Sequence, residues 1–165
     1  MFGKRKTRTP AEELKEGKFR RLCNVYMHRE TSRAIVVPML YDGIYVEDEA
    51  GITLCETTPE ISFGEIVRDH FKASRRGLIS GLGARKKTDW PAFKTSGLRS
   101  VAQFEREYIC VSVMGANEAN IIVRLESDPV QWGLKITTHC NPLSVEVLGS
   151  ELNKIRKHFL KWEKA

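Results

Sequence analysis

The residues best able to do chemistry in this chain are its cysteines and histidines, four of each. A metal site usually shows as ligands a few residues apart, and the chain has neither Cys-x-x-Cys nor His-x-x-x-His. His139 and Cys140 are adjacent, so on a strand their side chains would point to opposite faces of the sheet. We therefore expect no metal ion and no cofactor.

A cysteine nucleophile activated by a histidine has no fixed spacing, because such partners meet in space. We interpret the four cysteines as small, reduced core residues, since a domain of this size needs no disulfide. The glycines of residues 77–83 lack the preceding strand and the following Lys-Ser/Thr of a phosphate-binding loop. The chain is therefore predicted not to be an enzyme, and an active site assembled in space stays open as an alternative.

Three consecutive acids, Glu47, Asp48 and Glu49, lie around a predicted turn. Calcium loops need alternating oxygen ligands and a closing glutamate at a fixed distance, which these acids lack. A charged sheet edge that discourages pairing between molecules is the simpler interpretation. As an acidic patch, the three residues are also candidates for contact with a protein partner.

A basic and aromatic stretch offers a second kind of binding. Cations beside aromatic rings are the ingredients of single-stranded nucleic-acid binding. In the other interpretation, the rings anchor the segment to the core, and we favour this one. The stretch begins with Arg85, Lys86, Lys87, Trp90 and Phe93.

The distribution of charge argues against a nucleic-acid partner. Residues 1–22 hold eight bases and three acids, a net +5, whereas residues 23–165 hold 19 bases and 18 acids, a net +1. Phosphate binding recruits many cations, so a module that uses the N-terminal segment and the Arg85 cluster is kept only as the alternative. Residues 42–65 have seven acids and no base, and residues 68–99 have nine bases and two acids. These runs are either solvated faces or patches that steer a protein partner.

The composition is ordinary for a globular protein, with 41% hydrophobic and 29% charged residues. No stretch approaches the roughly 18 apolar residues of a membrane span. The basic start is not followed by the apolar stretch of a secretory signal. We expect a cytoplasmic protein with no membrane partner. Residues 1–20 should form a basic, partly flexible segment and residues 21–165 a single domain.

Alternation and turn signals predict strands in the first third of the chain, after a short helix near Thr9-Pro10. Pro38 cannot donate to a ladder, so its strand should lie at an edge or carry a bulge. A Ser62-x-x-Glu65 capping box opens a helix that should end near Gly77. The expected strands form an antiparallel meander of residues 22–28, 33–41, 44–47 and 52–55.

The second half repeats this alternation of helices and strands. Ser100 and Gln103 open a short helix, and the last helix lies within residues 144–162. Its inner stripe should contain Leu148, Leu152, Ile155, Phe159 and Trp162. Strands are expected at residues 108–114, 121–125 and 130–138. Hairpins with a few helices predict a single-domain α+β fold, an antiparallel or mixed sheet with helices packed on it.

One pattern combines Trp90, the run KTSGLRS at residues 94–100, Phe104 and the strand at residues 108–113. The helix with Gly64 and the last helix, near Leu148-Gly149, fit the same pattern. It resembles the cytoplasmic immunity proteins of bacterial contact-dependent growth inhibition systems, over roughly residues 20 to 162.

The resemblance implies a protein that neutralises the C-terminal toxin domain, often a nuclease, of a cognate effector. In some similar proteins a toxin strand adds to a sheet edge, for which the Pro38 strand is a candidate. Nuclease inhibitors are often acidic whereas this chain is basic, although its acidic run would suit a basic toxin. The expected partner-binding residues are Trp90, Arg99, Arg85, Lys86 and Lys87, with Glu47, Asp48 and Glu49.

Overall fold

The structure is a computed structural model that describes residues 20–79, 81–84, 86–118, 121–126, 135–140 and 144–164. The N-terminal segment, the helix predicted near Thr9 and the candidate residue Arg85 lie outside these described residues.

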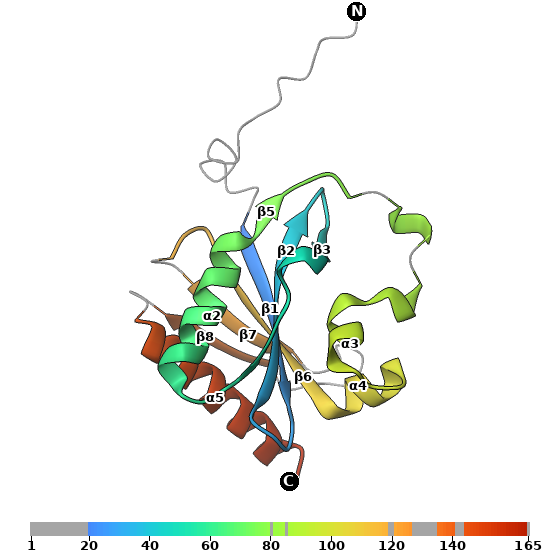
Figure 1. The fold of residues 1–165 in the computed structure, drawn as a ribbon. Helices are drawn as coiled ribbons and strands as arrows, with labels where there is room; N and C mark the ends of the chain where they lie inside the picture. The colour runs from blue at the N-terminus through green and yellow to red at the C-terminus, as the bar shows by residue number, and fades with distance from the viewer. Residues whose placement is uncertain are drawn as a thin grey trace, which may run out of the picture.

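An eight-stranded sheet forms the centre of the molecule (Figure 1). Six strands follow the order β3-β2-β1-β6-β7-β8, and β4 and β5 also pair with β2. Every pairing is antiparallel except the one between β5 and β2. The strands are β1 (Arg21–His28), β2 (Arg33–Tyr41), β3 (Tyr45–Glu47), β4 (Thr53–Glu56), β5 (Arg75–Arg76), β6 (Tyr108–Gly115), β7 (Ile121–Glu126) and β8 (Lys135–Cys140).

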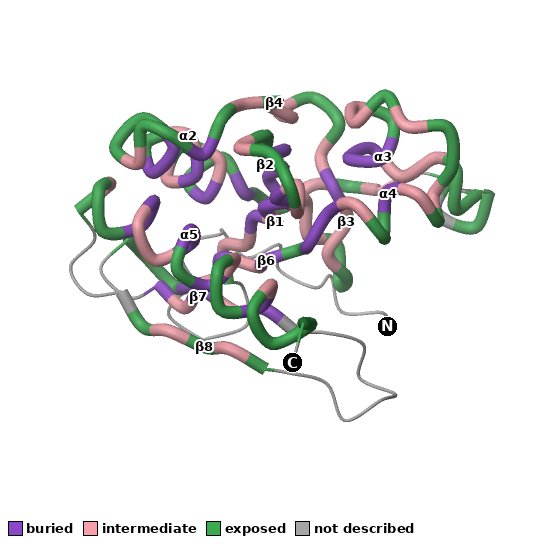
Figure 2. The backbone as a smooth tube through the Cα atoms, turned by 90° about the horizontal axis from the view of Figure 1, so that it is seen from below, coloured by how far each residue is buried: buried purple, intermediate pink, exposed green. Residues whose placement is uncertain are grey.

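Helices lie on both faces of the sheet, as Figures 1 and 2 show from two directions. Two long helices, α2 (Glu60–Ala73) and α5 (Val145–Trp162), cover one face, and two short ones, α3 (Pro91–Ser96) and α4 (Val101–Glu107), lie on the other. This arrangement confirms the predicted α+β fold. Three 3-10 turns complete the described elements: η1 (Glu49–Gly51), η2 (Leu82–Ala84) and η3 (Lys87–Asp89).

The larger core lies under α2 and α5. Side chains from alternate positions of the central strands meet the apolar stripes of both helices, and each large side chain that is fully buried stabilises the fold by about 1.5–3 kcal/mol. Four of the five residues expected on the α5 stripe are buried, but Trp162 is 45% exposed in the last turn. The helical members of this core are Phe63, Val67, Phe71, Leu148, Leu152, Ile155 and Phe159.

The two long helices cross at a pair of glycines. A Cβ on Gly64 would lie 1.7 Å from the carbonyl oxygen of Val145, and a Cβ on Gly149 would lie 2.1 Å from that of Glu60. The backbones therefore approach more closely than any larger residue would allow, which explains why glycine occupies both positions.

A smaller core lies on the opposite face, under α3 and α4. Tyr26, Ile35 and Val37 from the sheet contact Phe93 and Phe104 from the two short helices. This core fixes the segment that carries most of the predicted partner-binding residues.

The pairing of β2 differs from the predicted edge position and from the predicted meander. It lies between β1 on one side and β3 and β4 on the other, so the Pro38 strand is not an edge. The strand β4 pairs with the first half of β2, and β3 pairs with the second half. The change of partner occurs beside Pro38, which has no N–H to donate and whose carbonyl accepts from the Asp48 N–H. A simple meander, in which β4 pairs with β3, was therefore the wrong prediction.

The ends of α2 also correct the prediction. The helix begins at Glu60 with Pro59 as its N-cap, two residues before the expected capping box at Ser62. It ends at Ala73 with Ser74 as its C-cap, because the following arginines leave the helix and pair as β5 with Leu40 and Tyr41.

Candidate functional site

Four of the predicted partner-binding residues meet where the end of β3 contacts the start of α3. Glu47 is the last residue of β3, and its side chain is buried. Its carboxylate accepts hydrogen bonds from the Tyr26 hydroxyl at 2.5 Å, from Trp90 Nε1 at 2.9 Å and from the Ala92 backbone N–H at 2.9 Å. Glu47 therefore joins three segments that are distant in the sequence.

This geometry corrects the interpretation of Glu47 as part of an exposed acidic patch. A buried carboxylate requires donors to compensate the lost hydration, and here three donors converge on it. Burial, followed by the nearby Cys110 and Glu47 groups, raises the pKa of Tyr26 well above its ordinary value. The phenol therefore stays protonated, and its O–H donates a hydrogen bond to Glu47.

An aromatic cluster supports the same junction. The Trp90 ring meets Phe104 edge to face at 5.0 Å between centroids and Tyr26 at 5.7 Å. Phe93 contacts Phe104 at 6.2 Å, and Tyr108 stacks on Phe104 at 5.0 Å. These contacts confirm that Trp90 and Phe93 anchor their segment to the core. The Pro at the first position of α3 and Gly97 in the left-handed conformation (φ 71°) set the two ends of that short helix.

An open hollow of about 280 Å³ lies beside the junction, and we call it the Trp90 hollow. Its exposed lining is almost entirely apolar. The structure thus brings together four of the predicted partner-binding residues, two cations with an aromatic ring and a buried acid. The lining residues are Val46, Glu47, Lys86, Lys87, Asp89, Trp90 and Pro91.

The other predicted residues do not line this hollow. Asp48 pairs with Arg75, with Nη2 and Oδ2 3.1 Å apart, and caps η1 through the Ala50 N–H. Glu49 is exposed on η1, and Arg99 is exposed in the turn between α3 and α4.

Most of the acids in the run at residues 42–65 form contacts within the chain. Asp42 accepts from the Ile79 N–H, Glu56 accepts from the Ser32 hydroxyl, and Glu60 accepts from Asn153 Nδ2. Only Glu49 and Glu65 lack such a partner among the described residues. Within the run, Glu47 is buried and Asp48 pairs with Arg75, whereas the exposed acids are Asp42, Glu49, Glu56 and Glu65.

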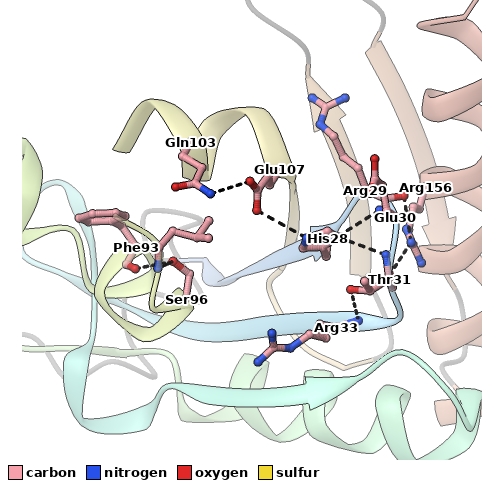
Figure 3. A network of polar contacts seen from close by, with 11 residues as sticks. His28, Arg29, Glu30, Thr31, Arg33, Phe93, Ser96, Gln103, Glu107 and Arg156 are labelled. Carbon is pink, nitrogen blue, oxygen red and sulfur yellow. Dashed lines mark hydrogen bonds and ion pairs between the residues drawn. The ribbon is translucent and has the colours of Figure 1, made fainter. Parts of the chain in front are cut away.

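A second polar cluster, which the sequence did not reveal, lies at the far end of β1 (Figure 3). His28 Nδ1 accepts from the backbone N–H groups of Glu30 and Thr31 at 3.1 and 3.2 Å, which assigns its proton to Nε2. Nε2 lies 3.7 Å from a Glu107 oxygen, and Gln103 donates to the other oxygen of Glu107. Both imidazole nitrogens thus have partners, and His28 orders the β1–β2 turn without offering a free base.

The same turn is tied to α5. Arg156 donates to the carbonyl oxygens of Arg29 and Thr31, and the Arg29 guanidinium pairs with Glu163 and lies 5.2 Å from the Phe159 ring centre. A hollow of about 350 Å³ opens here; of the residues that line it, His28 pairs with Glu107, and Arg29 pairs with Glu163 outside it. No local pattern predicts these contacts, because they join residues more than 70 positions apart.

In the part of the chain that is described, no three His, Cys, Asp or Glu side chains are arranged to hold a metal ion. Cys23 is buried, Cys55 is half-buried and Cys110 is exposed, so among these three described side chains the expectation of buried cysteines holds fully for Cys23 alone. Burial, and then Glu56, raises the pKa of the Cys55 thiol to about 11, so it is protonated at neutral pH. The described helices include none long and apolar enough to cross a bilayer.

Comparisons with known proteins agree only at the level of the fold. No family model matches the sequence, and no curated protein matches it. A protein of unknown function, NMB0488 from Neisseria meningitidis, superposes with a TM-score of 0.60 at 12% identity over 82% of this chain and 92% of that one. A chain of the CdiA-CT/CdiI toxin and immunity complex from Yersinia pseudotuberculosis superposes with a TM-score of 0.52 at 12% identity over 84% and 97%.

Proposed function

We propose that this protein is a cytoplasmic, non-enzymatic immunity protein that binds and neutralises the C-terminal toxin domain of a cognate contact-dependent growth inhibition effector. The observation that carries the proposal is the likeness of nearly the whole domain to a chain of a toxin and immunity complex. The resemblance noted in the sequence, which runs over roughly residues 20 to 162 and includes Trp90 and Phe104, led to the same family. The toxin is proposed to be a nuclease.

The candidate site suits a protein partner. Tight complexes depend on a few anchoring residues, enriched in aromatic rings and arginine, that lie in preformed and well-packed surroundings. Trp90 is half-buried at the surface and is held by Glu47 and Phe104. Neutralisation requires binding at nanomolar Kd or tighter, about 12 kcal/mol, which a standard interface of roughly 1,600 Å² can provide.

Co-expression with the toxin domain tests the proposal. The gene beside that of this protein should encode a large effector, whose C-terminal domain would be produced with the tagged full chain. We expect a stable complex to co-purify and the producing cells to survive, whereas cells with the toxin domain alone should stop growing. Growth arrest in both strains, with no complex, would overturn the proposal.

The nucleic-acid alternative is tested separately, by gel-shift titration at increasing salt. An immunity protein should bind DNA and RNA weakly, and removal of residues 1–20, which end before β1 and carry seven bases and three acids, should abolish what binding there is. Micromolar binding with a steep salt dependence that survives the truncation would favour the alternative.

A further inference from the structure

We infer that the Trp90 hollow receives an aromatic side chain of the toxin, and that a carboxylate next to it in the toxin chain pairs with Lys86 and Lys87. This inference rests on the proposed function and adds to it the binding site and the chemistry that the site recognises.

The walls of the hollow select an apolar group. Val46, Trp90 and Pro91 present carbon atoms, and the carboxylate of Glu47 is already engaged by Tyr26, Trp90 and Ala92. A polar group entering the hollow would lose water and find few new partners, which costs free energy. A ring would lose little and gain contact with the indole of Trp90.

The volume of the hollow selects the size of that group. About 280 Å³ exceeds the roughly 150 Å³ cavity that holds a benzene molecule, and it is at the lower end of pockets for drug-sized ligands. It therefore suits one aromatic side chain. Because the hollow is open to solvent, a free ring would bury only one side of itself and should bind weakly, and tight binding requires a larger surface that covers the rim.

The rim selects the charge. Lys86 and Lys87 are both exposed. Lys87 pairs with Glu105 at 3.0 Å, with the lysine side chain 71% exposed, whereas Lys86 forms no ion pair with a described residue. Asp89 is turned toward the backbone, where it accepts from the Lys86 N–H at 2.8 Å, and lies 3.7 Å from Lys94. Two lysines beside an apolar hollow are complementary to a partner that carries a carboxylate next to its ring.

The walls of the hollow are already formed in the unbound chain. Glu47 fixes Trp90 and the start of α3, and the Trp90 ring is wedged between Tyr26 and Phe104. A preformed wall spares the complex the conformational entropy of ordering those side chains, which favours affinity.

Calorimetric titration of the full chain with the effector's C-terminal domain provides the first test. The charge reversal Lys86→Glu with Lys87→Glu should weaken binding by about tenfold or more, as expected when rim charges oppose an acidic partner. The substitution Val46→Phe should weaken it as well, because the new ring fills the hollow. The matched control, Lys157→Glu with Lys161→Glu, alters exposed lysines on α5, on the other face of the sheet, and should leave the affinity within about twofold. Circular dichroism checks that each variant is folded.

Nuclear magnetic resonance on the indole N–H groups of the full chain provides the second test. The probe is the dipeptide acetyl-Phe-Asp-amide, and acetyl-Ala-Asn-amide is its matched control. The Trp90 signal, assigned with Trp90→Phe, should shift in a saturable way with the first peptide only. Trp162, which lies on α5, should not respond to either peptide.

The outcomes separate the two proposals. If the wild-type chain binds the toxin domain and both hollow variants bind equally tightly, the inference is overturned while the proposed function stands. If the wild-type chain does not bind the toxin domain, the proposed function is overturned. The inference that a toxin side chain occupies the hollow is then overturned too, even if the dipeptide shifts the Trp90 signal.

Discussion

At the scale of single residues, Glu47 is the most consequential side chain of the candidate site. Its carboxylate accepts hydrogen bonds from Tyr26 on β1, from the Trp90 indole and from the Ala92 N–H at the start of α3. Without Glu47, these three donors would lose this acceptor. Nothing in the sequence around Glu47 distinguishes it from Asp48 and Glu49, because its partners lie 21, 43 and 45 residues away.

Replacement of Glu47 by alanine should destabilise the protein by about 3–5 kcal/mol. An unpaired buried donor costs about 1–3 kcal/mol, and three donors would be left without an acceptor. Glu47→Gln should cost less, because one oxygen remains. Chemical denaturation measures the loss, with Glu49→Ala as the exposed control, expected within about 0.5 kcal/mol of wild type. A loss below about 1 kcal/mol in Glu47→Ala would contradict this role.

Tyr26 should make the stability fall at high pH. Its pKa is raised in the folded protein above the usual value of about 10, chiefly by burial. The folded state therefore holds its proton where the unfolded state has lost it, and the stabilisation present below pH 10 is lost as the pH rises above that value. The slope of unfolding free energy against pH above 10 should be shallower in Tyr26→Phe than in wild type. Equal slopes would show that Tyr26 does not contribute.

At the scale of elements, local signals predicted what local interactions determine. The strand at Arg33–Tyr41 and the Ser100 cap of α4, which accepts from the Gln103 N–H at 3.1 Å, appear as expected. The partner of β4 and the two-residue strand β5 could not be predicted, because each depends on where another strand ends. The helix α3 was missed because six residues are too few to show a period.

The crossing of α2 and α5 should tolerate no side chain at either glycine. Alanine favours a helix over glycine by about 1 kcal/mol, but its Cβ at Gly64 or Gly149 would overlap a backbone carbonyl that cannot rotate away. We expect a net loss of about 2–3 kcal/mol for each substitution, the upper range for overpacking. Thermal denaturation measures it, with Gly83→Ala as the control, since a Cβ there meets no atom within 4 Å. An unchanged melting temperature for Gly64→Ala would exclude so close a crossing.

At the scale of the whole molecule, one sheet supports two cores of unequal size. The larger joins α2 and α5 to β1, β2, β6 and β7, with β4 and β8 packed at its margin, whereas the smaller holds α3 and α4 over β1, β2 and the start of β6. Regions with fewer buried apolar contacts open at lower free energy than the global transition. The candidate site is built on the smaller core, so we expect this part of the molecule to unfold locally while the larger core stays folded.

Hydrogen exchange should reveal this division. Amides of α3 and α4 are expected to exchange through a partial opening, while those of β1 and β6 exchange only on global unfolding. In Glu47→Ala the protection of α3 and α4 should fall further than that of β1, because the link from β3 is gone. Equal protection factors in all four elements, in wild type and variant, would show a single cooperative unit instead.

The separation between the floor of the Trp90 hollow and its rim has a consequence for how such a protein can change over generations. Glu47 and Trp90 join β3 to α3, so a substitution at either residue should destabilise the fold. Lys86 and Lys87 are exposed, so substitutions there should change stability little. Under the proposed function, a lineage could therefore exchange its rim charges as its toxin diversifies, without rebuilding the scaffold beneath. Binding specificity and the ability to fold would then be inherited as nearly independent traits.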